Sequence, residues 1–299
     1  MKELVMVELT DDEARFKTLL QRPYIAWPTI MLAVAGLLVY VLAITAQHYG
    51  LIPAWLAVAC TSIAAFWFFT VFHDASHNSL SQNKNINDWL GRLAVCFLIM
   101  LPLYSANRFI HMQHHRFTNE ADDLDPDTWA VGGPRWQIPL RWMVQDIRYY
   151  TYYIPKMSQR PRAELVESAW AIVFFLVTVG GLVAAGFGWE VLLYWFLPGR
   201  IAIVMLVLTF SVLPHVPHEV TQKDDKYRAT NVRVGYEWLL SPLLLNQNYH
   251  LVHHLYPTVP FYRYLAVWRA KERFHRAQNP MLLQAFSNQE IVSSQKITS

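Results

Sequence analysis

Charged residues and cysteines are scarce in this sequence of 299 residues. Charged side chains make up 16% of it and hydrophobic ones 54%, a balance that is unusual for a soluble globule and favours a membrane protein. The net charge is only +3, and Lys and Arg form no stripe, which excludes a nucleic-acid-binding protein. The two cysteines, Cys60 and Cys96, lie in apolar runs without CxxC spacing, which excludes a disulfide framework, an iron–sulfur cluster and a thiolate zinc site.

Four apolar runs are long enough to cross a bilayer as helices, which takes about 20 residues each. The first two, residues 27–47 and 54–72, are joined by the turn HYGLIP, and the last two, 169–187 and 191–213, by GFGWE. We therefore predict an all-α polytopic membrane protein with four transmembrane helices in two hairpins. Interfacial helices are expected to form a cytoplasmic cap that holds the site described below. Residues 1–278 form a single membrane-embedded domain in this prediction, and residues 279–299 a polar, loosely ordered C-terminal tail.

Lys and Arg decide the predicted orientation. The two hairpin turns, near His48 and Gly188, contain neither residue, whereas the N-terminal, central and C-terminal segments contain nearly all of them. These three segments, and with them both termini, are expected on the cytoplasmic side. Arg200 lies inside the fourth run, and we interpret it as an arginine whose side chain extends to the outer membrane surface. A shorter run, residues 93–103, is too brief to cross and is predicted to be a re-entrant or interfacial helix.

All histidines except His48 and His275 fall into four short groups, HDASH, HMQHH, HVPH and HLVHH. Residues three and four apart share one face of a helix, so each group directs several imidazoles, which are common metal ligands, at a common centre. HDASH follows the second span, HVPH follows the fourth, and the other two motifs lie in segments predicted to be cytoplasmic. All four motifs are therefore expected at the cytoplasmic ends of the spans. The candidate ligands are His73, His77, His111, His114, His115, His215, His218, His250, His253 and His254.

The number of histidines predicts two metal ions, because more than about six imidazoles exceed what one first-row ion accommodates. Iron is the expected metal, since neutral nitrogen ligands leave the ions ready to bind oxygen and thiolates are lacking. Pro214 and Pro217 break the helix around HVPH, so only one of His215 and His218 is expected to be a ligand. A divalent-metal transporter is the non-enzyme alternative, although a transporter places its ligands near the middle of its spans.

The boxes HDASH, HMQHH and HLVHH resemble the HxxxH, HxxHH and HxxHH pattern of the membrane fatty acid desaturase superfamily, in order and in spacing. The resemblance covers roughly residues 25–275 and implies a non-haem diiron oxidoreductase with dioxygen as co-substrate. Asn248 precedes the third box and is implied to orient a ligand or to bridge to it through water. The implied ligands are His73, His77, His111, His114, His115, His250, His253 and His254, together with either His215 or His218.

The substrate stays open among several long hydrocarbons. The third-box context NQNYHLVHHLYP is similar to that of acyl-lipid desaturases and of carotenoid enzymes, whereas HHRFTNEADDLDPDTW and LPHVPH resemble stretches of carotenoid ketolases and hydroxylases. Desaturation of the acyl chain of a fatty acid or membrane lipid is expected first. Hydroxylation or ketolation of a carotenoid and oxidative decarboxylation of a fatty acid to a terminal alkene are the alternatives. The acidic run at 120–127 either orients imidazoles through their second nitrogens or is a solvated loop.

The source of electrons is expected to be a separate protein. The sequence contains no flavin or nicotinamide fingerprint and no haem-binding domain. A ferredoxin, a rubredoxin or a cytochrome would serve as the donor. The basic segments at 156–162 and 269–276 are candidates for docking an acidic carrier, or else for binding anionic lipid headgroups.

Overall fold

The first membrane hairpin consists of α2 (Trp27–His48) and α3 (Ala54–Ser76) in the computed structural model, which describes residues 11–98 and 101–291. The turn between the helices contains Gly50 in the left-handed region, with φ of +69°, and the extended Pro53 that precedes α3. Both predicted spans are confirmed. α3 continues past residue 72 as far as Ser76, so the first histidine box begins on the helix itself.

The second membrane hairpin starts with α8 (Arg162–Ala184) and returns as a continuous helix over Gly188–Val212. Both predicted spans are again confirmed, although α8 begins at Arg162 instead of residue 169, because its first two turns are polar and lower the local hydropathy. The returning helix contains two π-helical segments. Its parts are α9 (Gly188–Val191), η4 (Leu192–Phe196), α10 (Leu197–Leu206) and η5 (Val207–Val212).

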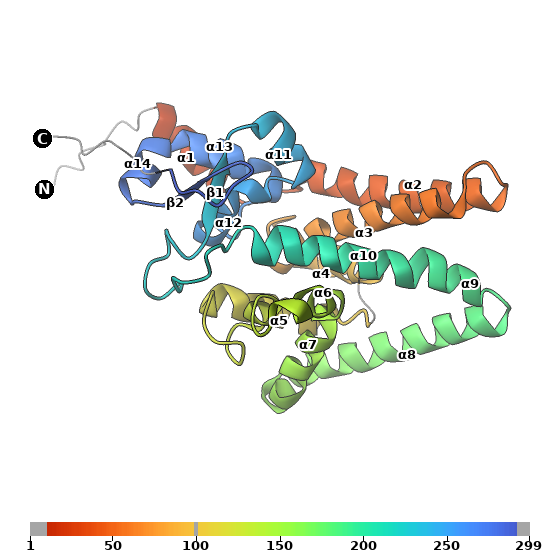
Figure 1. Ribbon diagram of the computed structural model, residues 1–299. Helices are drawn as coiled ribbons and strands as arrows, with labels where there is room; N and C mark the ends of the chain where they lie inside the picture. Colours follow the sequence, from red (N-terminus) through yellow and green to blue (C-terminus); the bar gives the residue numbers. More distant parts are fainter. Residues whose placement is uncertain (1–10, 99–100, 292–299) are drawn as a thin grey trace, which may run out of the picture.

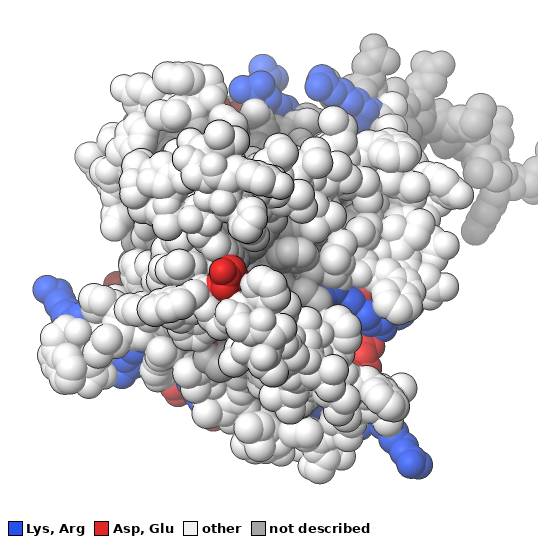
Figure 2. Space-filling view, turned by 90° about the vertical axis from the view of Figure 1, so that its right-hand side faces the viewer, with Lys and Arg blue, Asp and Glu red and all other residues white. Residues whose placement is uncertain are grey.

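The two hairpins extend in the same direction, and their turns lie at the same end of the molecule (Figure 1). α3 packs against α2, α4 and α10, and 61% of its most apolar window is buried, whereas only 6% of the corresponding window of α8 is buried. α8 therefore presents almost its whole surface to the surroundings, and apolar side chains on such a surface suit lipid. Figure 2 shows the turn end of the molecule as a largely uncharged face, with Lys and Arg toward its edges.

Arg200 forms an ion pair within the protein, so the interpretation that it extends to the outer membrane surface is wrong. Its guanidinium donates to both carboxylate oxygens of Asp146, over 2.8 and 2.6 Å, and to the carbonyl of Met143 over 3.1 Å. Asp146 lies on α7 (Gln145–Tyr153), 54 residues earlier in the chain. A charge inside a span is stable when such a partner neutralises it, and this pair joins α10 to α7.

The short apolar run at 93–103 does not form the predicted helix. Its first residues are the last turn of the amphipathic α4 (Lys84–Val95), and α5 (Tyr104–Phe117) begins only after its end. Residues 99–100 within this run lie outside the described residues. Gly91 brings the two helices together, because a Cβ atom at this position would overlap the ring of Tyr104.

The remaining elements lie at the end of the molecule opposite the hairpin turns or beside the second hairpin (Figure 1). They enclose a core that includes the fully buried side chains of Tyr264, Trp268 and Leu251. The helices are α1 (Asp11–Leu20), η1 (Pro126–Ala130), η2 (Arg135–Gln137), α6 (Ile138–Met143), η3 (Ile154–Gln159), α11 (Glu237–Leu243), η6 (Gln247–Tyr249), α12 (His250–Leu255), η7 (Phe261–Arg263), α13 (Tyr264–Ala270) and α14 (Glu272–Ala277).

Two short strands add a small parallel sheet to the mostly helical fold. β1 (Asn231–Val234) pairs with β2 (Met281–Gln284), with Asn231 opposite Met281, and the first three residues of each strand are buried. The expectation of a loosely ordered tail is therefore wrong for this part of 279–299, because apolar side chains anchor it. Residues 292–299 of the predicted tail lie outside the described residues.

Candidate metal centre

The first and second histidine boxes lie on two long helices. His73 is in the last turn of α3 and His77 caps its C-terminus, while α5 carries His111, His114 and His115. His73 and His77 are four residues apart, as are His111 and His115, so each pair lies on one face of its helix. The two helices thus direct several imidazoles toward the same region, as the box spacing predicts.

The other two groups of histidines lie on short or irregular segments. α12 is only six residues long and holds the whole third box. His215 lies three residues after the end of η5, and its backbone N–H donates to the carbonyl of Val212 over 3.2 Å. His218 has a left-handed backbone, with φ of +67°, which turns its side chain away from the direction that a continuing helix would give it.

Five histidines form what we call the first group, in which each offers one ring nitrogen within 4.8 Å of the others. Three pairs of Nε2 atoms lie 2.8 to 2.9 Å apart. Nitrogens bound about 2.1 Å from a metal at right angles to each other are about 3 Å apart, so this spacing fits ligands of one ion. The members of the first group are His73, His77, His111, His115 and His253.

Four more histidines form the second group by the same criterion. The Nε2 atoms of His250 and His254 are 3.1 Å apart, and the Nε2 of His215 is buried and has no hydrogen-bond partner among the described residues. An orphaned imidazole nitrogen aimed at other imidazoles is what a metal ligand looks like without its ion. The members of the second group are His114, His215, His250 and His254.

Most of the imidazoles are in the neutral state that binds metal, and His114, which faces two carboxylates, is the exception. Burial lowers the pKa of His77, His115, His253 and His254 well below the usual range, and it lowers the pKa of His111 to about 3. Neutral imidazole is the ligand form, and two first-row ions accommodate five and four such nitrogens. The donor set therefore fits a pair of iron ions.

Each imidazole of the second group has a partner at Nδ1, the nitrogen that faces away from the centre. Such a partner settles which nitrogen carries the proton and how the ring is turned. The distances at Nδ1 are 3.0 Å for His114 to Asp125, 2.6 Å for His250 to Gln247, 3.1 Å for His215 to the carbonyl of Ser211 and 3.4 Å for His254 to Thr118. In the first group, His253 Nδ1 lies 3.0 Å from the hydroxyl of Tyr264.

The acidic run at 120–127 divides between the two interpretations that the sequence allows. Asp122 and Asp123 are exposed, whereas Asp125 is buried against His114. Burial by itself lowers the pKa of His114, but the carboxylates of Asp125 and Asp127 raise it to about 9. The loop thus orients one imidazole, and its tip is solvated.

Two of the predicted site residues lie outside both groups. The His218 ring is stacked on that of His215, with ring centres 6.1 Å apart, but its nitrogens belong to neither group. The carbonyl of Asn248 accepts from the hydroxyl of Ser241 over 3.3 Å, and its amide lies 3.5 Å from the carbonyl of Arg233. Its neighbour Gln247 contacts a histidine instead, and the three-residue spacing to His250 is the signal that could have identified it.

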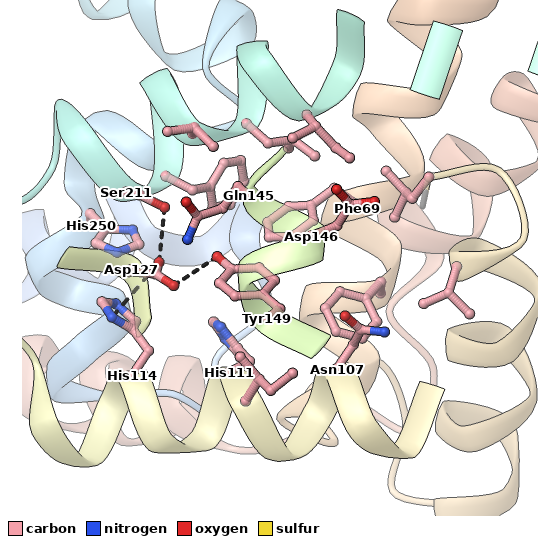
Figure 3. A pocket seen from close by; sticks show the side chains of 18 residues that line it. Phe69, Asn107, His111, His114, Asp127, Gln145, Asp146, Tyr149, Ser211 and His250 are labelled. Atoms are coloured by element: carbon pink, nitrogen blue, oxygen red, sulfur yellow. Dashed lines mark hydrogen bonds and ion pairs between the residues drawn. The ribbon is translucent and has the colours of Figure 1, made fainter. Parts of the chain in front are cut away.

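A cavity of about 80 Å³ touches both groups through His111, His114 and His250. Figure 3 shows these side chains along one part of its wall. Most of the remaining wall is apolar and comes from α3 and from α10 with η5, the two spans that pack together. The apolar lining residues are Phe69, Phe72, Val95, Leu98, Ile110, Ile203, Leu206, Val207 and Phe210.

One side of the cavity is polar. Asp127 accepts a hydrogen bond from the hydroxyl of Tyr149 over 2.7 Å and another from the hydroxyl of Ser211 over 2.8 Å, as Figure 3 shows. Gln145 and Asp146, at the start of α7, add two more polar side chains to the lining. The cavity therefore has an apolar wall along the spans and a hydrogen-bonded wall beside the second group.

The family model for fatty acid desaturases matches residues 51–284, which include both groups and three of the four spans. The chain belongs to the fatty acid desaturase family. This membership and the four apolar helices identify it as a membrane desaturase-like oxidoreductase, and they confirm the resemblance seen in the histidine boxes.

The relatives include both lipid and carotenoid enzymes. The chain is 25% identical to an sn-1 oleoyl-lipid 12-desaturase from Picosynechococcus over 80% of this chain and 74% of the relative. It is 26% identical to a chloroplastic omega-6 fatty acid desaturase from Spinacia oleracea, over 79% of this chain but only 57% of the relative. A beta-carotene ketolase from Paracoccus is 28% identical over 72% of this chain and 87% of the relative. The chain thus spans little more than half of the chloroplast relative.

Proposed function

We propose that this chain desaturates the acyl chain of a fatty acid or membrane lipid with dioxygen, using two irons bound by the first and second groups. The observation that carries the proposal is the position of the cavity, which touches both groups and is otherwise lined mainly by apolar side chains from two spans. A long hydrocarbon is apolar over most of its length, so a channel beside the ligands with a mainly apolar lining is the site that suits it. The desaturase names of several relatives support the same reaction.

The side chains of the cavity hold the substrate and exclude water. Phe69 and Phe210 pack edge to face, with ring centres 4.5 Å apart, on the wall beside the histidines. A rigid apolar wall of this kind fixes which C–H bond lies next to the ligands and keeps solvent from the reaction. When bound and reduced, two irons supply the activation of dioxygen that the oxidation of an unactivated C–H bond requires.

Ketolation or hydroxylation of a carotenoid ring is the second candidate. The observation in its favour is that the Paracoccus beta-carotene ketolase matches over 87% of its own length, a larger share than for the desaturases quoted above. Both reactions begin by removing hydrogen from an apolar carbon beside the ligands. They differ in whether a second hydrogen leaves or oxygen is inserted.

The two other candidates have less support. Decarboxylation would bring the carboxylate of a fatty acid next to the ligands, where Asp127 on the cavity wall would repel it, and the described lining contains no Lys or Arg. A metal transporter would place its ligands near the middle of its spans, whereas His73 is in the last turn of α3 and the second box lies outside the spans.

The orientation and the electron donor belong to the same proposal. Both hairpin turns lack Lys and Arg, which supports an outer location for the turns and a cytoplasmic location for the termini and the histidines. An acidic ferredoxin, rubredoxin or cytochrome would then dock from the cytoplasm. Arg160 and Arg276 already pair with Glu164 and Glu272, which weakens the basic segments as docking sites for such a carrier.

Product analysis in an expressing host tests the reaction. We expect acyl chains with one additional double bond in cells that express the wild-type chain, and none in cells that express His253→Ala. The matched control is His48→Ala. His48 is the last residue of α2, at the hairpin turn, and belongs to neither group of histidines.

The same extracts decide between the candidates. If the cells contain keto or hydroxy carotenoids and their acyl chains are unchanged, the reaction is the oxidation of a carotenoid and not the desaturation of a lipid. Unchanged lipids and pigments, from a chain that is inserted and carries its iron, would contradict the proposal.

A further inference from the structure

The carboxamide of Gln145 has an unsatisfied oxygen at the cavity. Gln145 begins α7, its side chain lines the cavity, and the residue is only 1% exposed. Its Nε2 donates to the carbonyl of Pro126 over 3.0 Å. Its Oε1 is buried and has no hydrogen-bond partner among the described residues. A buried acceptor without a donor is rare in a folded protein, so a partner from outside the chain is expected.

The orientation of this amide is determined by its neighbour. Exchanging the nitrogen and the oxygen would place Oε1 against the carbonyl oxygen of Pro126, and two acceptors repel each other. The oxygen therefore has to be the free end. It requires a hydrogen-bond donor from whatever occupies the cavity.

The neighbouring side chains on this wall also accept more readily than they donate. The hydroxyls of Tyr149 and Ser211 both donate to Asp127, and Asp146 is held by Arg200. An ester carbonyl or a carboxylate would bring another acceptor to this wall and would leave Gln145 unsatisfied. A hydroxyl group brings the donor that the wall lacks.

We propose that Gln145 determines substrate specificity by accepting a hydrogen bond from a hydroxyl group on a long hydrocarbon held in the cavity. This inference rests on the proposed function, because it assumes that the substrate is oxidised beside His111, His114 and His250. The hydroxyl lies near the oxidised carbon, since Gln145 and these histidines line the same small cavity. Two sources supply such chemistry, the hydroxylated ring of a carotenoid and a hydroxylated acyl chain.

Matched substrate pairs test this assignment with the purified holoenzyme and a reductase system. One pair is β-carotene and its ring-hydroxylated analogue, and the other is an acyl lipid with and without a hydroxyl on its chain. We expect the wild-type enzyme to prefer the hydroxylated member of one pair by at least about tenfold in kcat/KM, because the analogue leaves Oε1 unpaired. The pair that shows the preference identifies the source.

The Gln145→Leu variant should lose the preference, since leucine neither accepts a hydrogen bond nor disfavours an apolar analogue. Its ratio of kcat/KM values should fall to about one or below. Gln82→Leu is the matched control, because Gln82 is exposed, bonds only the carbonyl of Arg22 among the described residues and lies outside the cavity lining. The control should keep the wild-type ratio.

Equal kcat/KM values of the wild-type enzyme for both members of both pairs would overturn the inference and indicate that water satisfies Gln145. A preference that survives in folded Gln145→Leu would overturn it as well. If this variant does not fold, wild-type inhibition decides the matter: a long-chain alcohol should inhibit at least about tenfold more strongly than the matching alkane. If no lipid or carotenoid is oxidised at all, the proposed function itself fails.

Discussion

The two groups of histidines are built on different kinds of support. Four of the five members of the first group lie on α3 and α5, helices of 23 and 14 residues, or at the C-cap of α3. The second group takes two members from α12, which has six residues, and one from the segment after η5. Long helices position a side chain through their own packing, but a short helix has little stability of its own.

The hydrogen bonds at Nδ1 follow this difference. All four imidazoles of the second group have an Nδ1 partner, whereas in the first group His253, which also comes from the short α12, is the described member with a hydrogen bond there. The buried Nδ1 of His73 has none among the described residues. Ring orientation therefore comes from the backbone in the first group and from neighbouring side chains in the second.

Removal of a ligand is the largest perturbation of this comparison. His250→Ala leaves three histidines in the second group, while His73→Ala leaves four in the first. We expect His250→Ala to keep about one iron per chain. Its activity should fall by more than about 100-fold, because loss of a residue that only hydrogen-bonds a ligand already costs roughly 10- to 100-fold. His73→Ala should lose activity but keep more of its iron.

This prediction is tested by measuring the iron content per chain of the purified variants, with His48→Ala as the control. Equal iron loss in both variants would show that the two groups do not differ in ligand redundancy. Full iron content in both would contradict the ligand assignment altogether.

Removal of an orienting partner is expected to have an intermediate effect. Gln247→Leu deletes the acceptor at His250 Nδ1, and Tyr264→Phe deletes the partner of His253. Metal affinity should fall by roughly 10- to 100-fold in Gln247→Leu, because one ring of a four-histidine group becomes free to turn. Tyr264→Phe should have a smaller effect, since the other four rings of its group are held by long helices. Iron affinity, measured by competition with a chelator, decides whether the order is reversed.

The spans and the three boxes could be predicted because both are local signals. A run of about 20 apolar residues defines a span by itself, and spacings of three and four residues define a helical face. The choice between His215 and His218 could not be predicted. It depends on the left-handed backbone at His218, which follows two prolines and turns its ring out of the second group.

The partners that are far apart in sequence could not be predicted either. Arg200 and Asp146 are 54 residues apart, and His254 and Thr118 are 136 apart, so only the packed fold brings them together. The sequence does not predict the strand pair of β1 and β2, because four residues give too short an alternation of side chains to detect. The position of Asn248 before the third box predicts a contact to a ligand, but the contact to His250 comes from Gln247, the residue before it.

The smallest effect is expected at His218. Because its nitrogens belong to neither group, His218→Ala should keep two irons per chain, whereas His215→Ala should lose the iron of the second group. Iron content of the two variants, purified side by side, separates the roles of these neighbours. Iron loss in His218→Ala with retention in His215→Ala would reverse the assignment.

The account as a whole depends on two separate metal positions. Anomalous diffraction at the iron absorption edge from crystals of the anaerobically purified protein tests this most directly. We predict two peaks, one within the first group of five histidines and one within the second group of four. A single peak, or a peak outside these histidines, would contradict the account.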